Sequence, residues 1–526
     1  MRTDTPWSRL CVSVLTLLLA GAGAQVLNWT PDIRADVPVS STAALVPAPG
    51  MPTGATMDTL DLSWDNSIEA SGVYVLAQDL SGTEGYGVVI LSDNVILRGK
   101  GHSITGDGST ESEGESEGGV FLGPHSNVSV TGIELHDLDT GVAVEGTAGK
   151  TYQNVTLATI SFDNNKRGGS WYNYGSVQNV TVSQNHFVNN NIGLYWHAEP
   201  GSSAKEILFD DNFVQSTDLY GFLWSASGGT VDTIVFRDNS IEDNDLYGVA
   251  YYSDGPDSLG DLHFIGNHVH GSRYGVTLDN RGVGSDCRFS GNQFSQVRYG
   301  VRVDNRSTID ALVGVEIVNN TFDGAGIGVR VTNEADMANV NVKGNEFTNG
   351  DSPYSMPPAL PTGQISFFGG GKGIQVSGNT IQGGTDMSGI RLAGGYMGEQ
   401  PVPFYDVSIV NNQIQNLSGD DGSGPASGIH FFNLGADGVH LAAPLSADGS
   451  TTPTIVLNSF IDNAGPGVAY TKGYSNPLPA IDVGNNWWGD PAGPDGPSGD
   501  GVGDDVVVTT WMDGPPREVY LPLVNR

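Results

Sequence analysis

Two stretches, Val180-Thr-Val-Ser-Gln-Asn185-His-Phe187 and Ile234-Val-Phe236-Arg-Asp-Asn239-Ser-Ile241, share the pattern that decides the fold. Each is a short run of alternating apolar and polar residues, followed by Asn, one further residue and an apolar residue. A Gly then begins a second alternating run, at Gly193 and Gly248 respectively. Alternation with a period of two residues predicts strands that turn one side inward.

The pattern recurs from about residue 73 almost to the end of the chain. Its Asn falls at positions 185, 212, 239, 267, 292, 320 and 345, and then at 379, 412, 458 and 486 after longer steps that indicate insertions. Ile133 and Ile160 hold the same position in two weaker units before these. One unit cannot bury its inward side alone, but stacked units share a continuous core. A propeller blade needs roughly 40 residues, so the shorter units here argue against a propeller.

We therefore predict an all-β fold, a single-stranded right-handed parallel β-helix solenoid of about 14 coils. The recurring Asn is expected at a turn, because Asn tolerates a left-handed backbone and its amide can bond to the Asn of the next coil. The recurring Gly is expected to permit a positive φ at the next corner.

The segments outside the repeats complete the domain organisation. Residues 1–24 resemble a secretory signal peptide, with Arg2 and Arg9 before an apolar run and Ala22-Gly23-Ala24 as the cleavage site. Residues 25–60 are rich in Pro and Ala and are predicted to be a linker. The β-helix is assigned to residues 61–486. Residues 487–526 are predicted to form a cap and tail, in which Trp487 and Trp488 close the core.

Charge and cysteine content restrict the class of partner. Without the signal, the chain has 21 Lys and Arg against 58 Asp and Glu, a net charge of −37. Nucleic acid is therefore not an expected partner, because its phosphates require a basic face. Cys287 is then the one remaining cysteine, and its alternating context predicts a small buried residue. No segment has the apolar length of a membrane span. We expect a secreted monomer, extracellular or on the cell surface.

The repeats resemble those of the pectate-lyase-like superfamily of right-handed parallel β-helix proteins. Residues Gly484-Asn-Asn-Trp-Trp-Gly-Asp-Pro-Ala-Gly-Pro-Asp-Gly-Pro, followed by Trp511, are similar to a terminal coil of the NosD-type group. The resemblance covers roughly residues 73–512. It implies the fold, but not one activity, because this fold carries lyases, hydrolases, epimerases, adhesins and binding proteins. Copper handling in the NosD group would imply Met or His clusters, whereas the eight Met here are scattered.

The strands after each recurring Gly offer the candidate site. If their second and fourth residues point inward, the third and fifth form outward stripes. Outward aromatic residues suit sugar rings, Arg can bind a carboxylate with two hydrogen bonds, and two Asp can share proton transfer. The catalytic candidates are Asp279 and Asp304 as acid and base, with Arg281 and Arg306 as charge-stabilising groups. The substrate-binding candidates are Tyr195, His197, Tyr252, Arg302, Arg330 and Arg391.

The same stripes have a second interpretation, a solvated sheet face held together by ion pairs. In this interpretation Arg302 and Arg330 pair with the carboxylates of Asp279, Asp304 and Glu334. The predicted function is accordingly binding of extracellular or cell-surface carbohydrate without catalysis, and the alternative is a polysaccharide lyase or glycoside hydrolase that acts on an acidic glycan. Whether the protein is an enzyme stays open. No cofactor is predicted, except that calcium stays open at Asp-rich segments, namely Asp420, Asp421, Asp490, Asp495, Asp500, Asp504 and Asp505.

Overall fold

A computed structural model describes residues 57–60, 64, 66–108, 117–253, 258–306, 312–333, 337–350, 363–394, 404–419, 426–433, 454–471, 481–503 and 506–515. The chain divides into two units, residues 1–49 and 50–526, and every described residue belongs to the second. The predicted signal peptide lies outside the described residues, and so does the predicted linker up to residue 56. Strand β1 (Met57–Leu60) occupies the last residues of that range and pairs with β3.

The described residues form three long parallel sheets. Sheet A contains 17 strands, which are β1, β3 (Gly72–Leu76), β6 (Val95–Arg98), β9 (Val128–Thr131), β12 (Thr151–Ala158), β15 (Ser176–Ser183), β18 (Ser203–Asp210), β21 (Thr230–Arg237), β24 (Ser258–Ile265), β27 (Val283–Ser290), β30 (Leu312–Val318), β33 (Met337–Lys343), β36 (Gly371–Lys372), β37 (Gln375–Ser377), β40 (Phe404–Tyr405), β41 (Ser408–Val410) and β44 (Thr454–Val456).

Sheet C contains 14 strands, which are β4 (Leu80–Ser81), β7 (Ser103–Thr105), β10 (Glu134–His136), β13 (Ser161–Asp163), β16 (His186–Val188), β19 (Phe213–Gln215), β22 (Ser240–Glu242), β25 (His268–His270), β28 (Gln293–Ser295), β31 (Thr321–Asp323), β34 (Glu346–Thr348), β38 (Thr380–Thr385), β42 (Gln413–Ser418) and β45 (Ser459–Ile461).

Sheet B contains 15 strands, which are β2 (Asn66–Ile68), β5 (Tyr86–Ile90), β8 (Gly118–Leu122), β11 (Thr140–Glu145), β14 (Arg167–Asn173), β17 (Ile192–Ala198), β20 (Tyr220–Ala226), β23 (Tyr247–Ser253), β26 (Tyr274–Asn280), β29 (Tyr299–Asn305), β32 (Ile327–Asn333), β35 (Gly363–Gly369), β39 (Ser388–Gly394), β43 (Ile429–Asn433) and β46 (Val468–Thr471). A short pair, β47 (Ile481–Asp482) and β48 (Val506–Val507), follows them.

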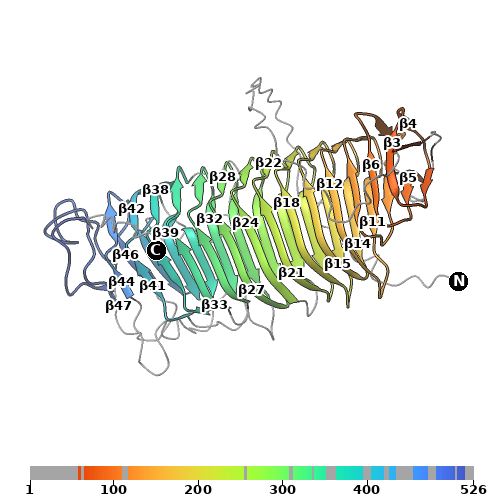
Figure 1. Ribbon diagram of the computed structural model, residues 1–526. Coiled ribbons are helices and arrows are strands. Elements are labelled where there is room, and N and C mark those ends of the chain that lie inside the picture. The colour runs from red at the N-terminus through yellow and green to blue at the C-terminus, as the bar shows by residue number, and fades with distance from the viewer. Residues whose placement is uncertain are drawn as a thin grey trace, which may run out of the picture. The chain divides into compact units, whose positions relative to one another are not determined.

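One coil passes through sheet A, then sheet C, then sheet B, as β15, β16 and β17 do. Each strand pairs in parallel with the strand one coil later, so that Val180 lies beside Ile207 and Phe187 beside Val214. Figure 1 shows the strands stacked in chain order along this repeat. The predicted right-handed parallel β-helix is confirmed, and no helix long and apolar enough to cross a membrane occurs among the residues described.

The core lies inside the coils and is built from inward rows of like side chains. On sheet B the second and fourth residues of each run, counted with the recurring Gly as the first, point inward as predicted: in the run from Gly193, Leu194 and Trp196 are both buried in the core. Trp171, Trp196 and Trp224 stack with ring centroids 4.3 and 4.4 Å apart. Parallel register places identical side chains one above the other, so aromatic stacking adds to the burial of apolar surface.

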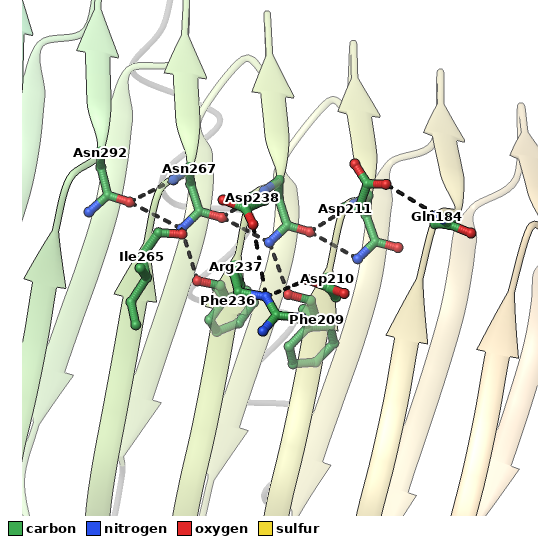
Figure 2. A network of polar contacts seen from close by, with 12 residues as sticks. Gln184, Phe209, Asp210, Asp211, Phe236, Arg237, Asp238, Ile265, Asn267 and Asn292 are labelled. Carbon is green, nitrogen blue, oxygen red and sulfur yellow. Dashed lines mark hydrogen bonds and ion pairs between the residues drawn. The ribbon is translucent and has the colours of Figure 1, made fainter. Parts of the chain in front are cut away.

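The recurring Asn residues form one continuous ladder at the turn between sheets A and C. From Asn185 to Asn486, each side-chain Nδ2 donates to the Oδ1 of the Asn one coil later, over 2.8–3.1 Å. Figure 2 shows this contact between Asn267 and Asn292. The ladder ends at Ile160. Its backbone N–H donates to the Oδ1 of Asn185, but its apolar side chain cannot form a hydrogen bond that extends the ladder to an earlier coil. The predicted bonding along the axis is therefore confirmed.

Two details of the predicted turns are wrong. The left-handed residue is the one before each ladder Asn, such as Asp238 at φ 53° and Gly266 at φ 67°, while the ladder Asn itself is not left-handed. The recurring Gly does not have a positive φ either. A Cβ on Gly193 would lie 2.4 Å from the carbonyl oxygen of Gly221 in the next coil. Glycine is required there because two backbones approach closely, not because the backbone turns.

At the C-terminal end, Trp488 is fully buried and packs against Phe460 of the last sheet C strand, with ring centroids 5.1 Å apart. Isolated parallel bridges join Ser459 to Trp487 and Val468 to Val502. The chain after residue 487 therefore continues to bond to the last coil. Residues 516–526 lie outside the described residues.

Candidate functional site

The two candidate carboxylates lie side by side on the outer face of sheet B. Asp279 in β26 pairs in register with Asp304 in β29. Between each Asp and the Arg that follows stands an Asn that turns inward and is fully buried. Asn280 donates to Asn305 over 3.2 Å, and Asn305 donates to Asn333 over 3.0 Å. This buried row fixes the strand ends, and the alternation of the strand then holds both Asp side chains outward.

Two arginines bind the carboxylates together. The guanidinium of Arg302 contacts the Oδ2 of Asp304, and the Nη2 of Arg306 lies 3.5 Å from Asp279 Oδ2 and 3.4 Å from Asp304 Oδ2. The side chain of Asp304 is 2% exposed, that of Asp279 10% and that of Arg306 35%. The second Oδ atom of each Asp is buried and accepts no hydrogen bond from a described residue. We call these four residues, Asp279, Arg302, Asp304 and Arg306, the Asp–Arg cluster.

Within the Asp–Arg cluster the two carboxyl groups have opposite shifts. Burial raises the pKa of Asp279; the charge of Arg306 opposes this effect, and the negative charge of Asp304 adds to it. Burial alone would also raise the pKa of Asp304, but Arg302, Arg330 and Arg306 outweigh it and lower that pKa. Neighbouring carboxyl groups whose pKa values are driven apart can divide the roles of acid and base.

A row of tyrosines, absent from the sequence-based prediction, leads into the cluster. Tyr220, Tyr247, Tyr274 and Tyr299 stack in consecutive coils, with ring centroids 5.0, 4.5 and 5.2 Å apart. We call them the tyrosine row. The Arg302 guanidinium lies 5.5 Å above the Tyr274 ring, and that of Arg330 lies 5.6 Å above the Tyr299 ring. The signal was present in the sequence, because each of these Tyr stands directly before a recurring Gly.

Tyr252 and Arg330 join the tyrosine row to the cluster. The Tyr252 ring meets the edges of Tyr220 and Tyr247 at angles of 89° and 83°, and its strand neighbour in register is Asp279. Burial raises the pKa of Tyr252 above its usual range and that of Tyr220 to about 12, so both stay protonated at neutral pH. Arg330 is buried, in register with Arg302, and also lies 5.1 Å above the Phe368 ring.

Tyr195 and His197 form a separate half-buried group three coils earlier. Arg167 lies 5.3 Å above the Tyr195 ring and donates to the Tyr172 hydroxyl over 3.1 Å. His197 Nε2 lies 3.2 Å from the Oε1 of Glu199. These residues lie on the same sheet B face as the cluster, but strands β20 and β23 separate them from it.

The other two predicted site residues lie apart from the cluster. Arg281 is exposed just beyond β26, and its positive charge acts on Asp279 without a salt bridge between the two. Arg391 is completely buried in β39, where its guanidinium lies 4.5 Å above the Phe432 ring and its Nη1 lies 3.4 Å from His430 Nδ1. Glu334, a predicted ion-pair partner, lies outside the described residues.

No group of three or more His, Cys, Asp or Glu suited to a metal ion occurs in the described part of the chain. Of the Asp residues for which calcium was left open, Asp490 accepts hydrogen bonds from the backbone of Ala492 and from Ser498, and Asp500 accepts them from Asn463. Asp420, Asp421, Asp504 and Asp505 lie outside the described residues.

Comparisons with known proteins address the fold. No curated protein sequence matches this chain. Among solved structures, an α-1,3-glucanase from Streptomyces thermodiastaticus is 15% identical at a TM-score of 0.33, covering 81% of this chain and 71% of its own. An exopolygalacturonase from Thermotoga maritima is 12% identical at a TM-score of 0.28, covering 55% and 70%. PfbA, a surface adhesin of Streptococcus pneumoniae, is 14% identical at a TM-score of 0.32, covering 70% and 84%.

The family model described as "Right handed beta helix region" matches residues 118–294 and 279–487, and so includes the tyrosine row and the Asp–Arg cluster. Together with the three parallel sheets, this match establishes the family. The chain belongs to the right-handed β-helix family of the pectate-lyase-like superfamily.

Proposed function

We propose that this protein binds polysaccharide along the outer face of sheet B, outside the cytoplasm. One observation carries the proposal: the tyrosine row runs directly into the Asp–Arg cluster on one face of consecutive strands. Three of the four rings are half-buried, so part of each stays open to solvent. Because the rings stack on one another, their outer edges together offer apolar surface to a sugar chain, at little cost in conformational entropy.

The charged end of this face favours a glycan that carries carboxylates. Arg306 is the most exposed guanidinium of the cluster and uses one nitrogen, Nη2, for both Asp residues. A guanidinium that reaches solvent can contact an anionic group of a ligand, and it can form two parallel hydrogen bonds with a carboxylate. A chain with a net charge of −36 repels polyanions in general, so recognition of an acidic glycan requires such a local site.

The test is calorimetric titration of the full-length protein with acidic and neutral oligosaccharides. Tyr247→Ala should weaken binding by about fivefold, because contact with one aromatic side chain contributes on the order of 1 kcal/mol. Arg306→Ala should weaken acidic ligands more than neutral ones. Arg237→Ala is the matched control, because Arg237 also pairs with an Asp, at 2.7 Å from Asp210, but on sheet A (Figure 2). Equal loss in the Arg306 and Arg237 variants would reject the proposal.

A second function, acid–base cleavage of the bound glycan, is favoured by the opposite pKa shifts of Asp279 and Asp304. In this proposal Asp279 is protonated more readily and donates a proton, while Asp304 stays ionised and stabilises positive charge or accepts a proton. The two functions separate in one assay. If unsaturated products or new reducing ends form and are abolished by Asp279→Asn, the protein is an enzyme; binding without turnover supports the non-catalytic function.

A further inference from the structure

A hollow lies on sheet A, a different sheet from the one that carries the proposed glycan face. It is open to solvent and has a volume of about 460 Å³, which is within the usual range for small-molecule sites. Its floor is a stripe of side chains in register across strands β24, β27, β30, β33 and β37. The stripe contains His263, Arg288, Glu316, Asn341 and Gln375.

One left-handed corner of sheet A forms part of the lining of the hollow. In the N-terminal coils this corner holds Asn94, Asn127, Asn154 and Asn179, whose amides bond to one another over 2.7–2.8 Å. At the hollow the same corner alternates between a side chain and none, as Asp286, Gly314, Asn339 and Gly373. Glu206 takes this corner in the coil after Asn179, so the amide row ends before the hollow, and two of the four corner positions at the hollow are glycines without a side chain.

The lining groups suit a ligand that both donates and accepts hydrogen bonds. Carboxylates of Asp286 and Glu316 accept, the Arg288 guanidinium donates, and the amides of Asn341 and Gln375 do both. Arg288 and Glu316 lie 3.4 Å apart with side chains about half exposed. An exposed pair of this kind contributes little to folding, so its atoms can form hydrogen bonds with a ligand at low cost. A hydroxyl group is the complement of such alternating donors and acceptors.

The charge of the hollow excludes anions. Arg288 is neutralised by Glu316, and Asp286 adds a further negative charge at the rim. This is the reverse of the Asp–Arg cluster, where two arginines meet two carboxylates and Arg330 lies nearby. We propose that the sheet A hollow is a second binding site, for an uncharged, hydroxyl-rich oligosaccharide, on the same coils that carry the sheet B face.

The test fills the hollow without disturbing the backbone. Gly314→Asn places a side chain at the corner where the next coil holds Asn339, at a φ of +80° that Asn tolerates better than other side chains. The new Cβ would lie 3.0 Å from the flexible Oδ1 of Asp286. Gly291→Asn is the matched control: φ is +66° there, no atom lies within 4 Å of the new Cβ, and the residue is outside the hollow.

Cellohexaose, maltohexaose, laminarihexaose and mannohexaose are titrated into the full-length protein by calorimetry, with oligogalacturonate as the anionic probe. We expect at least one uncharged probe to bind and Gly314→Asn to weaken it by more than about tenfold, with binding by Gly291→Asn unchanged. Glu316→Gln, which removes the charge but keeps the shape, should weaken the same probe. The proposal is overturned if no uncharged probe binds, or if Gly314→Asn binds as well as the Gly291→Asn control. Gly314→Asn should leave oligogalacturonate binding unchanged, because that probe binds the sheet B face. The experiment therefore distinguishes an absent sheet A site from an absent sheet B site.

Discussion

The asparagine ladder and the Asp–Arg cluster are both rows of polar side chains stacked from coil to coil, but they differ in how their bonds are completed. In the ladder, the Asn267 side chain donates to Phe236 and Asn292 and accepts from Asn239, so it is fully bonded inside the protein. In the cluster, the Oδ1 atoms of Asp279 and Asp304 accept no hydrogen bond from a described residue.

This difference in hydrogen bonding distinguishes a row that stabilises the fold from a row that is a candidate functional site. A neutral amide can repeat along the axis without limit, because each Asn supplies the donor and the acceptor that the next one needs. A carboxylate accepts only, and two adjacent carboxylates repel. The Asp pair therefore persists only with arginines around it, and one oxygen of each carboxylate is left without a hydrogen bond from a described residue. Complete bonding indicates a structural row, and incomplete bonding a candidate site.

The largest effect is expected from breaking the ladder. Asn267→Ala removes the acceptor of the buried Asn239 backbone N–H and the donor to the Phe236 carbonyl, and each buried group left unpaired costs about 1–3 kcal/mol. We expect a loss of roughly 4 kcal/mol in the free energy of unfolding, measured by urea denaturation, with faster hydrogen exchange in this and adjacent coils.

Glycan binding on the sheet B face should survive in the Asn267→Ala protein that remains folded. Gln293→Ala is the control, because Gln293 stands next to Asn292 but is exposed, and it should change stability by less than about 0.5 kcal/mol. Equal destabilisation by the two variants would show that the ladder does not stabilise the fold as argued.

A smaller and asymmetric effect is expected in the cluster. Asp304→Asn keeps the shape but removes the negative charge that Arg302 and Arg306 contact, so we expect a loss of about 2 kcal/mol. Asp279→Asn should leave stability unchanged or raise it, because burial already disfavours the charged form of Asp279. The same denaturation experiment measures both, and a larger loss for Asp279→Asn would reverse the assignment of the two carboxyl groups.

The pH dependence of stability should separate the two carboxyl groups further. The lowered pKa of Asp304 contributes stability that is present above its ordinary pKa near 3.8 and is lost as pH falls through the folded-state value. The raised pKa of Asp279 has the opposite sign, and its contribution is lost as pH rises above 3.8 through the folded-state value. Asp279→Asn should therefore remove a decline in stability with rising pH, and Asp304→Asn a decline with falling pH, in unfolding curves measured between about pH 3 and 7.

The fold could be predicted from the sequence because the spacing of the repeat shows which residues of successive coils lie side by side. The Asn positions from 185 to 486 identify one stacked turn, and each of them is a ladder residue in the structure. What the repeat could not show is the backbone conformation within the turn. The left-handed residue proved to be the neighbour of each Asn, and the Gly serves a close approach between coils, because recurrence marks a position without stating why it recurs.

The candidate site could be predicted only in part. Placing Asp279 beside Asp304 follows from register alone. The contacts of Arg306 with both carboxylates and the complete burial of Arg391 depend on side-chain direction and on what covers the sheet, which alternation does not give. The sequence-based prediction does not include the tyrosine row, because its strands begin at the recurring Gly and each Tyr stands one residue before that Gly.

The smallest loss of stability is expected at Cys287, because its side chain contributes packing but none of the ladder's hydrogen bonds. Its side chain is buried, as predicted, and burial raises the pKa of its thiol to about 12. Cys287→Ala should cost about 1 kcal/mol, the value of one buried group of methylene size. The native thiol should resist alkylation at neutral pH and react only on unfolding, because the thiolate is the reactive form. If Cys287→Ala costs as much as Asn267→Ala in the neighbouring coil, the ladder stabilises the fold by packing alone, and its hydrogen bonds do not distinguish it from the Asp–Arg cluster.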